Sequence, residues 1–159
     1  MMNSLLCQIA TLGPIGRKLP APGTAGSLVA LIIGYFIYQQ GYLAMLSATV
    51  ATVVIGVMAA DAYENMSGKK DSSEIIIDEV AGQFAVLLCI PKFASQPLIW
   101  FGLAFILFRF FDILKIWPIN KAEQIKGGVG VMADDIVAAS WAGICLLGIF
   151  VLLSPYLAG

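Results

Sequence analysis

The sequence predicts an all-α integral membrane protein, built as a bundle of about four to five apolar helices with a short amphipathic N-terminal segment. Composition is the first reason, because 60% of the 159 residues are hydrophobic, only 12% are charged, and the mean hydropathy is +0.91. Soluble domains carry about 25% charged residues. Pattern is the second reason, because long apolar runs alternate with short polar connections. The length suits one domain that covers residues 1–159.

The apolar runs differ in how well each would fit a bilayer. The run 42–60 has about the 20 residues that a spanning helix needs. The run 79–91 would reach only about 20 Å as a helix, so we expect it to be tilted, re-entrant or covered by neighbouring helices. Ser27 is expected to cap the run that follows it. The sequence thus predicts helices over 28–38, 42–60, 79–91, 98–115 and 136–153, an interfacial segment over 4–19 and a short amphipathic piece over 119–126.

Composition also excludes several kinds of chemistry. The chain has no histidine, which removes His-ligated zinc, phosphohistidine intermediates and Ser-His-Asp triads. Cys7, Cys89 and Cys145 stand apart among apolar residues, so we expect buried structural thiols. A net charge of -1 provides no basic field for nucleic acid. The first residues lack a basic region, so a cleaved signal peptide is not expected.

Charged and glycine-rich residues gather in four short clusters, each at a point where an apolar helix begins or ends. The clusters cover residues 22–27, 78–79, 109–115 and 127–135. With five crossings or near-crossings, all four fall on the same side of the bundle. Lysine and arginine concentrate in the loops of that side and leave Lys92 opposite, so the positive-inside rule makes the side cytoplasmic.

The clusters combine groups that attract a cation with groups that attract an anion. Several crowded carboxylates would repel one another unless a cation holds them, and ligands that are all oxygen suit Mg²⁺. Basic side chains and the N–H groups of glycine-rich helix starts suit a phosphate. Together they meet the needs of metal-assisted phosphoryl transfer. The carboxylates are Asp78, Glu79, Asp112, Asp134 and Asp135, the cations are Arg109 and Lys115, and the helix starts contribute Thr24, Gly26, Ser27 and Gly128.

Each cluster alone also has a purely structural explanation. Arg109 and Asp112 would form an i,i+3 salt bridge, and the pair 134–135 would interact with a helix dipole. Asp61 and Glu64 are either a solvated helix end, which we favour, or outer ligands of the site. Four clusters together in a chain so poor in charge favour a functional explanation.

The clusters resemble the motifs of one enzyme family. Pro22-Gly23-Thr24 with Gly26-Ser27, Asp78-Glu79 with Gly82, Phe108-Arg109 with Phe111-Asp112 and Lys115, Trp117-Pro118-Ile119, and Gly127-Gly128 with Gly130, Met132 and Asp134-Asp135 are similar to those of phosphatidylglycerophosphatase A. The resemblance runs over about residues 12–143. It implies an all-α, Mg²⁺-dependent enzyme of the bacterial inner membrane, which removes the terminal phosphate of phosphatidylglycerophosphate, a lipid substrate, to give phosphatidylglycerol.

The resemblance also implies roles for individual residues, whose division is our inference. The expected catalytic residues are Asp78, Glu79, Asp112, Lys115, Asp134 and Asp135; the expected metal ligands are Asp78, Glu79, Asp134 and Asp135; the expected phosphate contacts are Thr24, Gly26, Ser27, Arg109, Lys115 and Gly128. Two positions depart from the family pattern. Ile116 replaces a proline, which should let the preceding helix run slightly further, and Ala139 replaces a glycine. Neither change removes a functional group.

The main alternative is a small ion-coupled transporter or channel subunit, in which charges inside the membrane mark an ion path. That alternative predicts charges near the middle of spans, whereas here they lie at helix ends. A phospholipid phosphotransferase would also use carboxylates and a metal, but the spaced Asp and Gly signature of those enzymes is absent. For a phosphatase, water and a carboxylate both stand as the attacking group.

Overall fold

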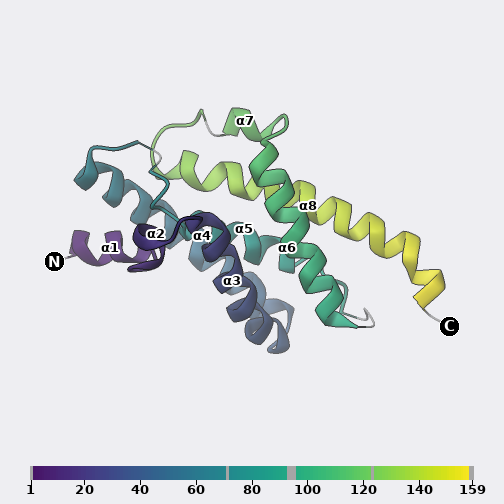
Figure 1. Cartoon of the computed structure of the whole chain (residues 1–159). Helices are drawn as coiled ribbons and strands as arrows, with labels where there is room; N and C mark the ends of the chain where they lie inside the picture. The colour runs from purple at the N-terminus through teal and green to yellow at the C-terminus, as the bar shows by residue number, and fades with distance from the viewer. Residues whose placement is uncertain (1, 71, 93–95, 123, 158–159) are drawn as a thin grey trace.

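The computed structural model describes residues 2–70, 72–92, 96–122 and 124–157, and within these ranges the chain is helical and contains no strand (Figure 1). The predicted all-α fold is therefore confirmed. The helices are α1 (Met2–Ala10), α2 (Ile15–Lys18), α3 (Pro22–Gln39), α4 (Tyr42–Ser67), α5 (Ile77–Leu87), α6 (Pro97–Leu114), α7 (Ile119–Ala122) and α8 (Gly128–Leu157).

In the described part of the chain, the helices long and apolar enough to cross a membrane are α4, α6 and residues 128–153 of α8. Their outer faces carry large apolar side chains, and Leu43, Leu98 and Leu152 are each at least 70% exposed. A soluble protein rarely exposes so much apolar surface, whereas lipid would cover it in a bilayer. The helical bundle is thus that of a membrane protein.

Helix α5 lies at the centre of this bundle. Its 11 residues reach only about 16 Å, much less than the roughly 30 Å of a bilayer core. Nine of the 11 are buried, because α3, α4, α6 and α8 all pack against it. Of the three arrangements expected for the run 79–91, the covered one is observed.

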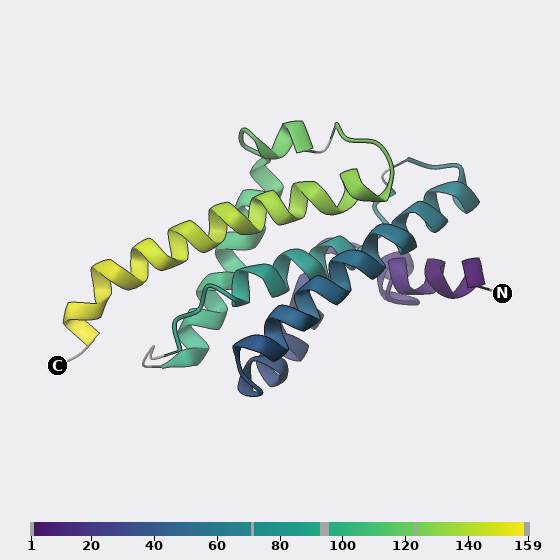
Figure 2. The same ribbon diagram turned by 180° about the vertical axis from the view of Figure 1, so that it is seen from behind.

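The helix directions bring particular helix ends together. Figures 1 and 2 show that α4 and α6 run toward one end of the bundle, whereas α3, α5 and α8 start at that end and run away from it. The predicted interfacial segment over 4–19 contains the short helices α1 and α2, which lie beside α4 and α3 respectively. All four polar clusters consequently lie at one end of the bundle, which we call the charged end.

Helix α3 begins earlier than the sequence predicts. It starts at Pro22, and Ser27 lies inside the helix and is not its N-cap. Proline suits a first turn because the N–H that it lacks would be unpaired there. A Cβ atom on Gly26 would touch Ile76 and Glu79, so this glycine lets α3 lie close to the start of α5. Tertiary packing therefore overrides the low helix propensity of this segment.

Helices α6 and α8 also differ from expectation at their ends. Helix α6 ends at Leu114, although Ile116 was expected to prolong it. Lys115 has a φ of 44°, a left-handed conformation that is uncommon outside glycine, and the chain turns there toward α7. Helix α8 starts at Gly128, so Asp134 and Asp135 lie about two turns inside it. A helix dipole acts mainly on the first turn, which weakens that explanation for the aspartate pair.

Candidate functional site

A cavity of about 340 Å³ opens at the charged end of the bundle. Its walls come from the start of α3, the segment before α5, the first turn of α5, the end of α6 and the second turn of α8. Most of the residues that the sequence predicts for the site line it: Thr24, Asp78, Glu79, Arg109, Asp112, Lys115, Asp134 and Asp135. Residues far apart in the sequence therefore meet at one site.

Glu79 is the most constrained carboxylate of this cavity. The Ser27 hydroxyl donates a hydrogen bond of 2.9 Å to Glu79 Oε2, and Arg109 Nη1 donates to the same oxygen. A Cβ atom on Gly23 would overlap Glu79 Oε1 in this orientation, so the glycine leaves room for the carboxylate. Burial, and then the negative charge of Asp112, raise the pKa of the Glu79 carboxyl, while Arg109 opposes the rise. The glutamate is therefore fixed in one orientation by α3 and α6.

Three carboxylates form a group that could hold a metal ion. One oxygen from each of Glu79, Asp112 and Asp135 lies within 4.8 Å of the other two. Arg109 bonds to two of these residues, since its Nη1 lies 3.1 Å from Asp112 Oδ2. The sequence predicted Asp112 as a catalytic residue but not as a metal ligand, and an i,i+3 salt bridge to Arg109 was its structural alternative. The structure shows the salt bridge and also places the Asp112 carboxylate beside Glu79 and Asp135.

Asp135 provides the strongest sign that this group holds something. This residue is 3% exposed, and its buried Oδ2 atom receives no hydrogen bond from any donor in the described part of the chain. A buried acceptor without a partner is costly, and carboxylate oxygens are the ligands that a hard cation prefers. The residues present therefore fit a divalent cation bound by oxygen.

Asp78 lies in the same cavity beside this carboxylate group. Its Oδ1 accepts the Glu79 backbone N–H at 2.9 Å. Desolvation, followed by the negative charge of Glu79, raises the pKa of the Asp78 carboxyl well above its usual range. The crowding of negative charge expected from the sequence is thus present, and a bound cation would relieve it.

Lys115 and Asp134 form a second ion pair in the same cavity. Lys115 Nζ donates to Asp134 Oδ2 at 2.9 Å. The Lys115 side chain is 32% exposed, whereas that of Arg109 is 14% exposed. Lys115 is therefore the cation that an incoming anion can reach more easily, and Arg109 is held mainly among the carboxylates.

Three of the expected phosphate contacts do not line the cavity, and their observed contacts are with the protein. Gly26 packs against α5, and Ser27 bonds to Glu79. The Gly128 N–H donates to Asp61 Oδ1 at 2.6 Å, and a Cβ atom there would overlap the Val57 carbonyl on α4. These three residues position the walls of the cavity.

Sequence reasoning missed two residues that position the site. Gly23 accommodates Glu79, and Asp61 binds the first turn of α8, where the sequence favoured a solvated end. Gly23 belongs to a glycine-rich cluster that was expected to seat a phosphate, so a signal for it existed. Nothing local to Asp61 indicates its partner, because the contact joins distant segments.

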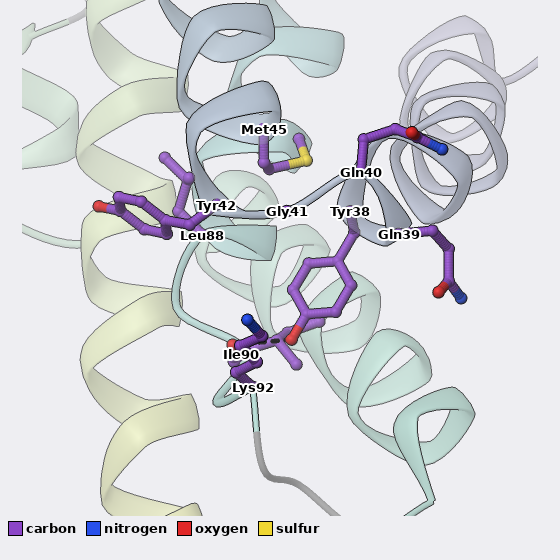
Figure 3. Close-up of a pocket in the computed structure, with 9 residues that line it drawn as sticks. All are labelled: Tyr38, Gln39, Gln40, Gly41, Tyr42, Met45, Leu88, Ile90 and Lys92. Carbon is purple, nitrogen blue, oxygen red and sulfur yellow. Dashed lines mark hydrogen bonds between the residues drawn. The ribbon is translucent and has the colours of Figure 1, made fainter.

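A second cavity of about 460 Å³ lies at the opposite end of the bundle, around the turn between α3 and α4. Figure 3 shows its lining, in which the Tyr38 hydroxyl donates to the Ile90 carbonyl at 3.2 Å. Tyrosine, glutamine and apolar side chains surround it, with Lys92 as the charged member. It is larger than the first cavity, but none of the described residues that line it is a carboxylate.

Comparisons with known proteins identify the family of this chain. The family model described as phosphatidylglycerophosphatase A matches residues 8–150. A Bacteroides thetaiotaomicron protein named putative phosphatidylinositol-3-phosphatase is 40% identical over 132 residues, which cover 79% of this chain and 81% of that protein. Phosphatidylglycerophosphatase A of Haemophilus influenzae is 37% identical over 158 residues, with 92% and 95% covered.

Phosphatidylglycerophosphatase A of Escherichia coli is 32% identical over 118 residues, which cover 74% of this chain and 67% of that protein. No solved structure matches the chain. The family match extends over all four clusters and the cavity that they form. The chain therefore belongs to the phosphatidylglycerophosphatase A family.

Proposed function

We propose that this chain is a Mg²⁺-dependent lipid phosphatase, which hydrolyses the terminal phosphomonoester of phosphatidylglycerophosphate to phosphatidylglycerol and phosphate. Residues 1–159 would act as one domain, because the cavity takes its walls from α3, α5, α6 and α8. The family supports this activity, and two relatives carry the corresponding name.

One observation carries the proposal: five carboxylates and two cations line a single cavity in a chain with only 12% charged residues. Carboxylates alone would suit a metal store, and cations alone would suit an anion-binding protein. Both together suit a reaction in which a metal and fixed positive charge act on one phosphate.

The residues of the cavity would have different roles in binding the metal and the phosphate. Glu79, Asp112 and Asp135 would hold Mg²⁺, with Asp78 and Asp134 close to it in the same cavity. When bound, Mg²⁺ supplies positive charge that offsets the charge on the phosphate oxygens in the transition state. Lys115 would bind the phosphate from the more exposed wall, Thr24 would donate from the start of α3, and Arg109 with Ser27 would keep Glu79 in place.

The position of the charges disfavours a transporter or channel. Ion paths through a membrane require polar groups near the middle of the spans. In the described residues, the acidic and basic side chains of this cavity come from the end of α6 and the starts of α5 and α8. A site at one membrane face suits a lipid headgroup.

We further propose that the charged end faces the cytoplasm of a bacterial inner membrane, because the basic loops lie at this end. Cysteines introduced at Lys70 and Gln124 should be protected from an impermeant thiol reagent added outside intact cells. A cysteine at Gln40, at the opposite end, should be labelled. Labelling of Lys70 and Gln124 positions but not of the Gln40 position would reverse the orientation.

The activity is tested by phosphate release from phosphatidylglycerophosphate by the purified protein, with Mg²⁺ and after chelation. We expect release only with the metal, since the ligand candidates are all carboxylates. Full activity after exhaustive chelation would contradict the metal requirement, and no release in either condition would contradict the proposed reaction.

A substrate panel sharpens this test, because the relative that is 40% identical has a name that refers to a different lipid phosphate. Phosphatidylinositol 3-phosphate should therefore be assayed beside phosphatidylglycerophosphate under the same conditions. A higher kcat/KM for phosphatidylglycerophosphate is expected. The reverse order would assign the chain to the inositol lipid.

A further inference from the structure

An apolar groove runs between α3 and α6, below the catalytic cavity. It has a volume of about 360 Å³ and is lined from α3 by Leu31, Ile32 and Tyr35, and from α6 by Leu98, Phe101 and Gly102, among others. Tyr35 and Phe101 pack edge to face at its inner wall, with ring centroids 5.4 Å apart. Apart from the Tyr35 hydroxyl, its side chains offer nothing for a polar ligand to bind.

The groove is open toward the surface that the bilayer would cover. Ile32, Phe36 and Leu98 line it and remain 55%, 64% and 70% exposed. A flexible hydrocarbon chain could therefore enter from the side, between the two helices, without passing through water.

The groove and the catalytic cavity lie on the same faces of the same two helices. On α3, Leu31 follows Thr24 by seven residues, and on α6, Gly102 precedes Arg109 by seven residues. Seven residues are close to two helical turns, so each pair shares a face and is about 10 Å apart along the axis. Thr24 and Arg109 line the cavity, whereas Leu31 and Gly102 line the groove. Figure 1 shows α3 and α6 descending from this end of the bundle.

We propose that the groove binds one acyl chain of the lipid substrate while the cavity binds its phosphate. The inference rests on the proposed function, because it requires a lipid phosphate in the cavity. A lipid with its phosphate beside Lys115 has its acyl chains directed into the bilayer, along the helices. The groove between α3 and α6 is apolar and open to the side, and it lies about two helical turns from the cavity on the same two helices, as such a chain requires.

Gly102 allows the groove to be filled without disturbing the helix. A Cβ atom added there would meet no other atom within 4 Å, and α6 has an ordinary helical backbone at this position. Gly102→Leu would therefore place a side chain in the space that the acyl chain occupies. Gly148→Leu is the matched control, because Gly148 also has no neighbour within 4 Å but lies on α8, outside the groove.

The test measures kcat/KM for phosphatidylglycerophosphate with two oleoyl chains and with two butanoyl chains, which would place far less hydrocarbon in the groove. Gly102→Leu should lower kcat/KM for the oleoyl lipid by about tenfold or more, and Gly102→Ala by less, because hydrophobic pockets discriminate by such factors per added group. Neither substitution should change kcat/KM for the butanoyl lipid more than about twofold. Gly148→Leu should behave as the parent with both lipids.

Two results would overturn the inference. An equal loss with both lipids would mean that Gly102→Leu disturbs the cavity, and no loss with either lipid would mean that the groove does not bind the substrate. Gly102→Ala keeps the test valid if the leucine variant does not fold. Failure of the parent to release phosphate from both lipids would instead contradict the proposed function itself.

Discussion

The two ends of the bundle each contain a cavity, yet only the charged end is built for chemistry. The cavity at the opposite end is larger, about 460 Å³ against about 340 Å³. It is lined by tyrosine, glutamine and apolar groups with Lys92, whereas the charged end brings together five carboxylates with Arg109 and Lys115. Volume alone would select the wrong end.

The difference between the two cavities shows which kinds of side chain each end of the bundle needs. At the opposite end, Tyr38 and Tyr42 have an apolar body and a polar tip, which suits a membrane surface. At the charged end, buried carboxylates are stable only with partners, and Asp135 Oδ2 has none within the described residues. Burying this carboxylate oxygen without a donor costs free energy that the fold does not offset, which indicates a bound cation.

The largest expected effect comes from removing one carboxylate of the metal group. Asp135→Asn should lower phosphate release by at least about 100-fold, since loss of even the outer partners of a metal site costs 10–100-fold. The metal-free protein should be as stable as the parent or more so, because one repelling charge is gone. Turnover and thermal unfolding after chelation measure the two effects. A folded variant with near-parent turnover would return Asp135 to a structural role.

The next effect compares the cations of the two ends. Lys115→Ala should reduce kcat/KM by about 100-fold, the usual loss when one group that stabilises transition-state charge is removed. Lys92→Ala at the opposite cavity is the matched control and should leave kcat/KM unchanged. Similar losses in both variants would indicate a general electrostatic effect, and no loss in a well-folded Lys115→Ala protein would remove this lysine from the site.

A smaller effect is expected from Ser27, which positions Glu79. Ser27→Ala should lower turnover by about 10-fold and destabilise the fold by about 1–3 kcal/mol, because buried Glu79 loses a donor. Thr49→Val removes another buried hydroxyl, which bonds to the Met45 carbonyl of its own helix. This control should lose stability but not turnover. Equal losses of turnover in both variants would indicate that stability alone is responsible.

The smallest effect belongs to the opposite end. Tyr38→Phe removes the hydrogen bond to the Ile90 carbonyl and should cost about 0.5–1.5 kcal/mol of stability, with turnover unchanged. Thermal unfolding and phosphate release are measured on the same preparation. A loss of turnover greater than about tenfold would show that this cavity takes part in the reaction.

The sequence predicted the fold and the meeting of the clusters because both depend on hydrophobicity averaged over whole helices and not on single residues. Apolar runs define α4, α6 and α8 wherever their exact ends fall, and alternating helix directions bring the polar ends together. The starts of α3 and α8 were missed because local propensity was read without the packing partner. Pro22 and Gly23 look like a loop until the start of α5 is placed beside them.

The sequence predicted which residues belong to the site better than it predicted the role of each residue. Asp112 was expected as a catalytic residue but not as a metal ligand, although its carboxylate faces Glu79 and Asp135. Ser27 and Gly128 belong to motifs that suit phosphate, yet their observed contacts position Glu79 and α8. A motif shows that residues belong to a site, whereas the division between ligand and support depends on distances.

The claim that the charged end holds a divalent cation is tested most directly by measuring Mn²⁺ binding to the purified protein. Electron paramagnetic resonance detects the bound Mn²⁺, and Mg²⁺ is added as the competitor. We expect the parent to bind Mn²⁺, Mg²⁺ to displace it, and Asp135→Asn to bind it at least about tenfold more weakly. Lys92→Ala should bind as the parent does. Equal Mn²⁺ binding by the parent and Asp135→Asn would contradict the proposed metal site.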